Sequence, residues 1–167
     1  ARVSAFYNYV EYISAVETYG YAGEGSYRFG ASINGTKHYA GKMHNARIWD
    51  KACSRARLQT NSLTILSGAE SNLLAYYPMN EARGNMIADK AHGANLEMKG
   101  GSWAVPECRA ATFNGSNYII VNASASQVDQ TMDYTIELWF KAKAGAKNAT
   151  ILSNGRGDGS EYDNSLN

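Results

Sequence analysis

The sequence predicts an all-β protein, an antiparallel β-sandwich with one short helix. Tyr, Ile, Val, Phe and Thr gather in short runs, and Gly, Asn and Ser interrupt these runs at intervals of about 8 to 12 residues. The 167 residues include 16 Gly, 12 Tyr and only 2 Pro, and 44% of them are hydrophobic. Such a composition indicates a folded chain that is rich in turns and aromatic rings, and it argues against disorder.

The first clear elements lie in residues 27–49, which we interpret as two strands joined by the turn SINGTK. The pair Asn34-Gly35 can supply the positive φ angles of a tight hairpin turn. After this hairpin, Ser54 offers a side-chain oxygen as the N-cap of a helix that we expect to end near Gln59. The helix should be brief, because no Glu or Gln follows three residues later to complete a capping box.

The second half of the chain predicts strands throughout. Residues 67–107 alternate brief apolar runs with Gly, Asn and Asp, which indicates short strands and turns. Residues 134–140 read YTIELWF, in which every second residue is apolar, so one face of a strand can bury a core. We predict a central strand there, with Ile136 and Leu138 buried together.

The charge balance excludes two classes of partner. Sixteen Lys and Arg against 15 Asp and Glu give a formal net charge of +1, so no sequence-independent attraction to nucleic acid or to an anionic membrane is expected. No run approaches the roughly 18 apolar residues that cross a bilayer, and the first residues lack the apolar centre of a signal peptide. We therefore expect neither a nucleic-acid partner nor membrane insertion.

Several stretches together resemble one known family. GKMHNARIWDKACSRARL, at 41–58, is similar to the closing strand and helix of laminin G-like domains, which have a concanavalin A-like jelly-roll fold. NLLAYYPMNEARGNMIADKAHGANL, at 72–96, resembles the opening segment of the same family. The stretches at 110–121, 133–142 and 149–160 are similar to its next two strands and the hairpin after them. The resemblance implies a jelly roll.

The order of these motifs implies a tandem array. The closing motif precedes the opening motif, so residues 1–66 resemble the C-terminal part of one laminin G-like repeat. Residues 67–167 resemble the N-terminal part of the next repeat. Neighbouring repeats of the same polypeptide are then expected partners.

Calcium is the only cofactor that the sequence suggests. The resemblance implies a ligand at Asp89, although KAHGAN stands where the family commonly has Ser-Gly-Asn after the aspartate. A carboxylate that caps a turn is the alternative reading of Asp89. Asp158 and Asp163, in a Gly-rich acidic loop, offer the oxygen ligands that Ca²⁺ prefers, with a solvated loop as the alternative.

Two further motifs predict receptor binding and N-glycosylation at the surface. Arg156-Gly157-Asp158 matches a tripeptide that integrin-type receptors recognise, and a sharp hairpin would use the same glycines. Four positions fit the N-glycosylation pattern, which is compatible with secretion. They are Asn34, Asn114, Asn122 and Asn148.

The search for catalytic residues leaves none. Asp133 and Glu137 alternate along one strand around Thr135, similar to the carboxylates of laminarinase-type glucanases. A general acid and a nucleophile both need supporting carboxylates, which this strand lacks. The three histidines fit no metal-binding or hydrolase spacing. We therefore predict that the chain is not an enzyme.

The two cysteines, Cys53 and Cys108, leave two readings open. They lack the spacing of a zinc or redox site, and are either unpaired thiols or one disulfide of an oxidising compartment. If a closing and an opening segment of the family associate, we expect these residues to meet at the seam as a disulfide.

The predicted function is that of a non-enzymatic, extracellular or cell-surface adhesion or structural module in a repeat protein. Glycans or extracellular proteins are its expected ligands, since exposed Tyr and Trp rings can stack on sugars. The alternative is a carbohydrate-binding appendage of a secreted glycoside hydrolase.

Overall fold

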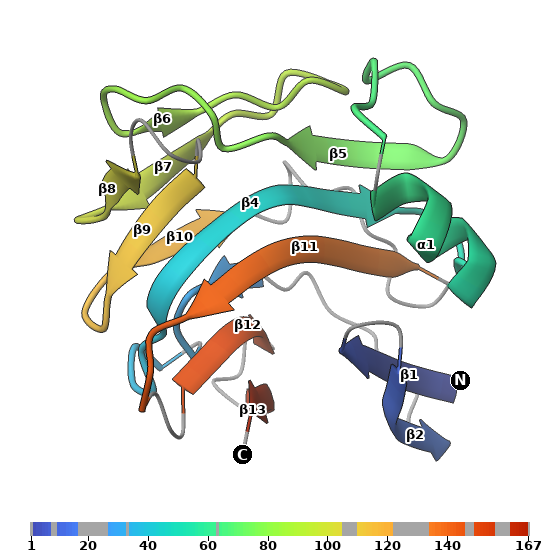
Figure 1. The fold of residues 1–167 in the computed structure, drawn as a ribbon, viewed down its shortest axis with the longest axis horizontal. Coiled ribbons are helices and arrows are strands. Elements are labelled where there is room, and N and C mark those ends of the chain that lie inside the picture. Colours follow the sequence, from blue (N-terminus) through green and yellow to red (C-terminus); the bar gives the residue numbers. More distant parts are fainter. Residues whose placement is uncertain are drawn as a thin grey trace.

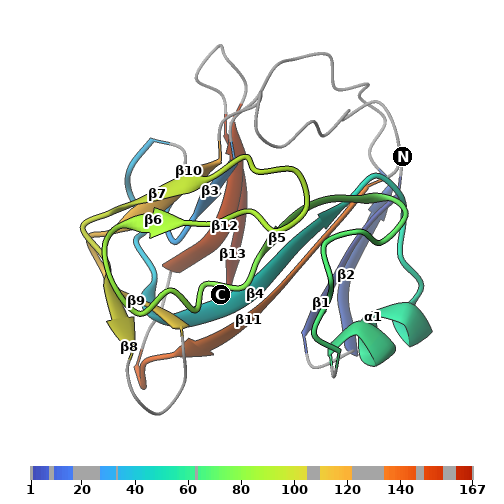
Figure 2. The same ribbon diagram turned by 90° about the horizontal axis from the view of Figure 1, so that it is seen from above.

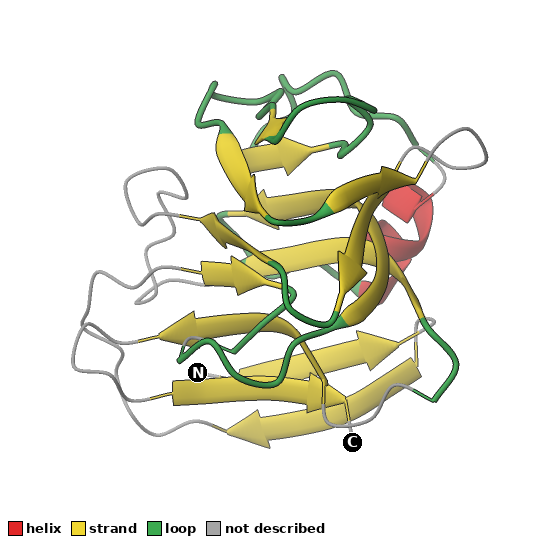
Figure 3. Cartoon of the chain, turned by 90° about the vertical axis from the view of Figure 1, so that its left-hand side faces the viewer, coloured by secondary structure: helices red, strands yellow, loops and turns green. Residues whose placement is uncertain are grey.

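The computed structural model confirms an all-β sandwich with one short helix (Figures 1 and 3). It describes residues 2–7, 10–16, 27–32, 34–62, 64–104, 110–121, 134–145, 149–155 and 161–166. All paired strands in this part of the chain are antiparallel. No helix among these residues is long and apolar enough to cross a membrane.

Two sheets form the sandwich (Figure 2). The six-stranded sheet has the order β13 (Glu161–Leu166), β12 (Ala149–Gly155), β3 (Tyr27–Phe29), β10 (Tyr118–Val121), β7 (Leu96–Lys99) and β6 (Met86–Ile87). The five-stranded sheet has the order β11 (Thr135–Ala142), β4 (Ala40–Trp49), β9 (Ala110–Asn114) and β8 (Ser102–Ala104), with β5 (Leu73–Tyr77) also paired to β4. A separate hairpin, β1 (Arg2–Tyr7) and β2 (Val10–Val16), lies outside both sheets.

The core fills the space between the two sheets. Both sheets contribute side chains that have no solvent exposure, such as Phe29 and Ile119 from one sheet and Met43 and Ile48 from the other. Burying each such side chain stabilises the fold by about 1.5 to 3 kcal/mol before its loss of conformational entropy. This core therefore holds the two sheets face to face.

Strand β4 organises the five-stranded sheet. It pairs with β11 on one side and, on the other side, with β9 along residues 40–43 and with β5 along residues 46–49. Gly41 allows close approach to β11, because a Cβ there would collide with the Lys141 carbonyl and the Tyr39 side chain.

A bulge in β4 changes which of its side chains face outward. Arg47 pairs with Glu137 and His44 pairs with Trp139, so two residues of β4 lie opposite Leu138 alone. Asn45, inside the bulge, has φ 51, a conformation that Asn tolerates better than most residues. The bulge shifts the alternation and brings Arg47 onto the same face as His44.

The predicted start of the helix at Ser54 is confirmed. Helix α1 spans Arg55–Ser62, and the Arg57 N–H donates to the Ser54 hydroxyl at 3.3 Å, as expected for an N-cap. The helix ends at Ser62 and not near Gln59.

The predicted hairpin over residues 27–49 is wrong. The turn itself forms, since the Gly35 N–H donates to the Ser32 carbonyl at 2.9 Å and Gly35 has φ 76. The flanking strands then part, because β3 joins the six-stranded sheet and β4 the five-stranded sheet. The turn therefore connects the two layers of the sandwich.

The predicted central strand is also wrong within the described residues. β11 forms where expected, but its only partner among the described strands is β4, so it lies at an edge. Ile136 and Leu138 point toward the core and are only partly buried.

Both predicted segments contribute to this one sandwich. Strands β3 and β4, from residues 1–66, pair with strands from residues 67–167 in both sheets. The assignment of the two segments to neighbouring repeats stays a prediction.

Candidate functional site

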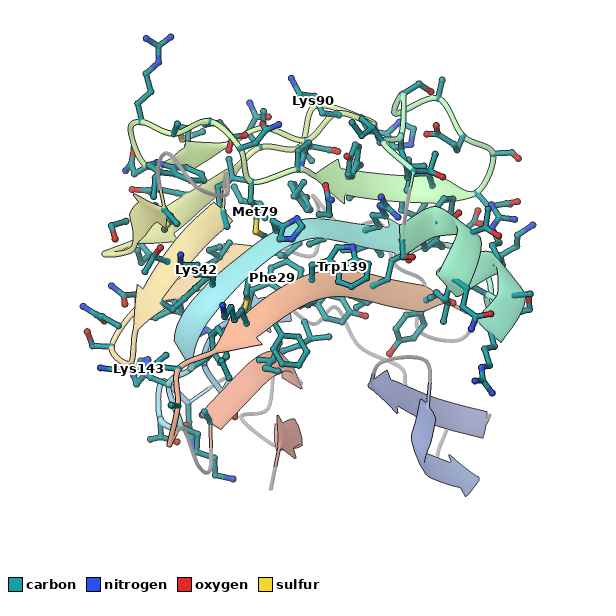
Figure 4. The ribbon with its side chains drawn as sticks, viewed as in Figure 1. Phe29, Lys42, Met79, Lys90, Trp139 and Lys143 are labelled. Carbon is teal, nitrogen blue, oxygen red and sulfur yellow. The ribbon has the colours of Figure 1, made fainter. Side chains whose placement is uncertain are left out.

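The candidate site lies on the outer face of the β4–β11 pair, which faces away from the core (Figure 4). We define this face by four cross-strand pairs. They are Lys42–Lys141, His44–Trp139, Arg47–Glu137 and Trp49–Thr135. The helix-side end of the face, with Arg47 and Trp49, and the far end, with His44 and Lys42, have different environments.

The helix-side end is a closed polar cluster. The Glu137 carboxylate oxygen Oε1 accepts hydrogen bonds from the Trp49 indole at 2.8 Å and from the Asn61 amide at 3.1 Å. The Arg47 guanidinium lies 3.5 Å from the same oxygen. The negative charge of the carboxylate strengthens each of these hydrogen bonds. Glu137 therefore links β11 to β4 and to α1.

Arg47 holds the end of α1 against the sheet. Its guanidinium donates to the backbone carbonyls of Asn61 at 2.7 Å and Thr64 at 2.6 Å. A cation near the last carbonyls of a helix is favourable, since these groups lack partners within the helix. The Arg47 side chain is only 1% exposed, and its position over the Tyr76 ring, 5.5 Å from the centroid, adds a cation–π contact.

The far end carries two parallel aromatic rings. The rings of His44 and Trp139 have centroids 6.3 Å apart and an interplanar angle of 17°, and both side chains are partly exposed. Beside them, Lys42 and Lys141 lie directly opposite each other. Figure 4 shows Trp139 over the middle of β11 and Lys42 farther along β4.

Electrostatics favour a neutral imidazole at this site. Burial lowers the pKa of His44 below its ordinary value of 6.5, and the nearby charge of Arg47 lowers it further. A neutral ring keeps one nitrogen as a hydrogen-bond acceptor and the other as a donor. The far end can therefore offer an aromatic surface together with polar groups of both kinds.

The structure places Asp89 in a turn. Its carboxylate accepts backbone N–H groups from Tyr76, Ala91, His92 and Ala94 at 2.9 to 3.2 Å. This is the geometry of the turn-capping alternative. A calcium role for Asp89 stays a prediction, and no cluster of three or more potential metal ligands occurs among the described residues.

Most other predicted site residues are not brought to this face. Cys53 is a free, half-buried thiol whose pKa is raised by burial. Asn34 lies exposed in a turn, and Asn114 lies exposed at the end of β9. Asp163 lies in β13, where its backbone pairs with that of Ser153 in β12. The predicted positions outside the described residues are Cys108, Asn122, Asp133, Asn148, Arg156, Gly157 and Asp158.

Sequence reasoning did not identify the pairing of His44 with Trp139. The available signal was Asn45, a residue disfavoured in strand interiors and tolerant of positive φ, which marks the bulge. In a regular strand, His44 and Arg47 would point to opposite faces, because they are three residues apart. The register of β4 and β11, which lie far apart in the sequence, could not be deduced from either strand alone.

Comparison with known proteins does not identify a family for this chain. No family model matches the chain, and neither the curated proteins nor the solved structures contain a match.

Proposed function

We propose that this chain is a non-enzymatic extracellular binding module, and that the His44–Trp139 end of the outer face binds a glycan. The observation that carries the proposal is the parallel, partly exposed ring pair. Aromatic rings offer a flat apolar surface to the C–H groups of a sugar, while polar groups at the rim bond its hydroxyls. The proposed fold type is a laminin G-like jelly roll.

The polar surroundings support a sugar ligand. Lys42 and Lys141 are cross-strand neighbours at the rim of the ring pair. Asn45, in the bulge, has its side-chain oxygen bonded to the Tyr76 hydroxyl at 3.2 Å, which fixes the orientation of the amide. Such a set suits the hydroxyl groups around a saccharide ring.

The environment of Glu137 supports a role without catalysis. A general acid must give its proton to the leaving group in the transition state. One Glu137 oxygen instead accepts hydrogen bonds from Trp49 and Asn61, close to Arg47. The same binding face would serve an adhesion module or a carbohydrate-binding appendage of a hydrolase.

A glycan array tests the proposal directly. We expect the purified chain to bind a subset of glycans, and Trp139→Ala to weaken that binding by about tenfold, equivalent to about 1.4 kcal/mol. Tyr118→Ala is the matched control, because it removes a partly exposed aromatic side chain from β10 in the opposite sheet. Absence of binding to every glycan, or equal binding by Trp139→Ala and the wild type, would refute the proposal.

A further inference from the structure

The dipeptide Asn-Gly occurs three times in the chain, each time in a different structural environment. The pairs are Asn34–Gly35, Asn114–Gly115 and Asn154–Gly155. Asn-Gly favours attack of the glycine backbone nitrogen on the asparagine side-chain amide, because glycine has no side chain to hinder that approach. The three pairs are identical as dipeptides, so the structure must decide which of them reacts.

At Asn114–Gly115, the asparagine amide is activated by two hydrogen-bond donors. Asn114 is the exposed last residue of β9, at the turn that leads to β10 in the other sheet. Its side-chain oxygen Oδ1 accepts hydrogen bonds from the Ser116 N–H at 2.9 Å and from the Ser116 hydroxyl at 2.7 Å. Donors aimed at a carbonyl oxygen stabilise the negative charge that develops there during nucleophilic attack. The amide carbon of Asn114 is therefore prepared to react.

The nitrogen that attacks, that of Gly115, is also available in this turn. Its N–H donates to no group among the described residues. The hydrogen bond from the Ser116 N–H to Asn114 Oδ1 closes a ring of atoms that contains this nitrogen, which keeps it beside the amide. Asn114 and Ser116 are both exposed, so water and hydroxide reach the turn.

The other two pairs are held by the backbone. Asn34 Oδ1 also accepts a hydrogen bond, from the Thr36 N–H at 2.9 Å, but the Gly35 N–H donates to the Ser32 carbonyl at 2.9 Å. That bond stabilises the protonated nitrogen and must break before the nitrogen can attack. Asn154 and Gly155 lie within β12, where both pair with β13 and Asn154 also pairs with β3. Rotation of their shared peptide would disrupt the sheet on both sides.

We propose that Asn114 deamidates by itself in the folded protein and that Ser116 accelerates the step. The Gly115 nitrogen loses its proton and forms a bond to Asn114 Cγ, the bond from Cγ to Nδ2 breaks, and Nδ2 leaves with the proton as ammonia. Water then opens the succinimide ring at either carbonyl and leaves aspartate or isoaspartate at position 114. Either product adds a negative charge to the turn, and isoaspartate also lengthens the main chain between the two sheets. This inference is independent of the proposed glycan site.

Incubation of the folded chain in isotopically labelled water tests the ranking of the three pairs. The protein is made in bacteria without N-glycosylation, since Asn114 also fits the glycosylation pattern, and is kept in mildly alkaline buffer. Tandem mass spectrometry locates the heavy oxygen that ring opening incorporates. We expect Asn114 to react at least about fivefold faster than Asn34 or Asn154, a factor that one ordinary hydrogen bond can supply. In urea the three rates should become similar, because only the shared dipeptide then remains.

The variant Ser116→Ala tests the activation of the amide. It removes one of the two donors to Asn114 Oδ1 and should slow deamidation at Asn114 by about threefold. The rate at Asn34 should stay unchanged and serves as the control within the same molecule, and thermal unfolding checks that the variant is folded. Equal rates at Asn114 and Asn34 in the folded protein would overturn the proposal. A rate at Asn114 that Ser116→Ala leaves unchanged or raises would overturn it as well.

Discussion

At the scale of single residues, Arg47 is the most constrained charged group on the outer face. It contacts β11 through Glu137, the last turn of α1 through the Asn61 carbonyl and the segment after the helix through the Thr64 carbonyl, and it is almost completely buried. A buried charge of this kind is tolerated only when several partners compensate for its lost hydration.

We expect Arg47→Ala to lower the free energy of unfolding by about 3 kcal/mol, because it leaves Glu137 and the backbone carbonyls of Asn61 and Thr64 without their cation. Arg57→Ala is the matched control. Arg57 is partly exposed and lies over the face of Trp49, 4.8 Å from the ring centroid, so its loss should cost less than about 1 kcal/mol. Urea denaturation measures both values, and similar costs for the two arginines would contradict the structural role of Arg47.

His44 predicts a dependence of stability on pH. The folded protein binds the His44 proton less tightly than the unfolded chain does, because burial and Arg47 lower the pKa. The stability contribution is therefore complete above the ordinary pKa of 6.5 and is lost as the pH falls below it. His44→Gln should flatten the fall in the urea midpoint between about pH 7 and pH 5. An unchanged slope in this variant would assign the effect to other groups.

At the scale of elements, β4 and β11 differ in ways that the sequence did not reveal. Both have alternating apolar residues, and residues 134–140 were predicted to form a central strand. The existence of each strand was predicted from its own residues. The edge position of β11 was not, because it depends on which distant segments pair with it.

The difference between the two strands predicts unequal costs of truncation. Ile48→Ala should lower the free energy of unfolding by about 2 to 5 kcal/mol, as for other fully buried aliphatic residues. Leu138→Ala should cost at least about 1 kcal/mol less, because this side chain is only partly buried. Equal costs would place β11 inside the sheet.

The helix and the turns show where local chemistry suffices. Ser54 predicted the helix start, because an N-cap is a contact between near neighbours in sequence. The turn at Gly35 was likewise predicted correctly. The fate of the strands that flank this turn depends on tertiary pairing, and local sequence gave no signal for it.

At the scale of the whole molecule, the two predicted segments are interleaved. Strands of residues 1–66 pair with strands of residues 67–167 in both sheets, and both contribute to one core. The sequence could suggest that the segments associate, because its stretches resemble closing and opening motifs of one family. It could not determine whether they do so within one chain.

We therefore expect the chain to unfold in a single cooperative transition. Differential scanning calorimetry should give a calorimetric enthalpy equal to the van 't Hoff enthalpy, as for one domain. Substituting Ile48 by Ala should lower the midpoint of this whole transition. Two separate transitions, with the Ile48 substitution leaving the midpoint of one of them unchanged, would show that the segments fold independently.

The position of β4 also has a consequence during biosynthesis. Its partner Glu137 lies 90 positions after Arg47, and a ribosome adds about 5 to 20 residues per second. The residues of β4 therefore leave the ribosome about 5 to 20 seconds before β11 can pair with one edge of the strand. Strand β5 follows β4 after only about 25 residues, so it can pair with part of the opposite edge of β4 much earlier. We expect nascent chains that stop between β5 and β11 to be the ones that engage chaperones and aggregate.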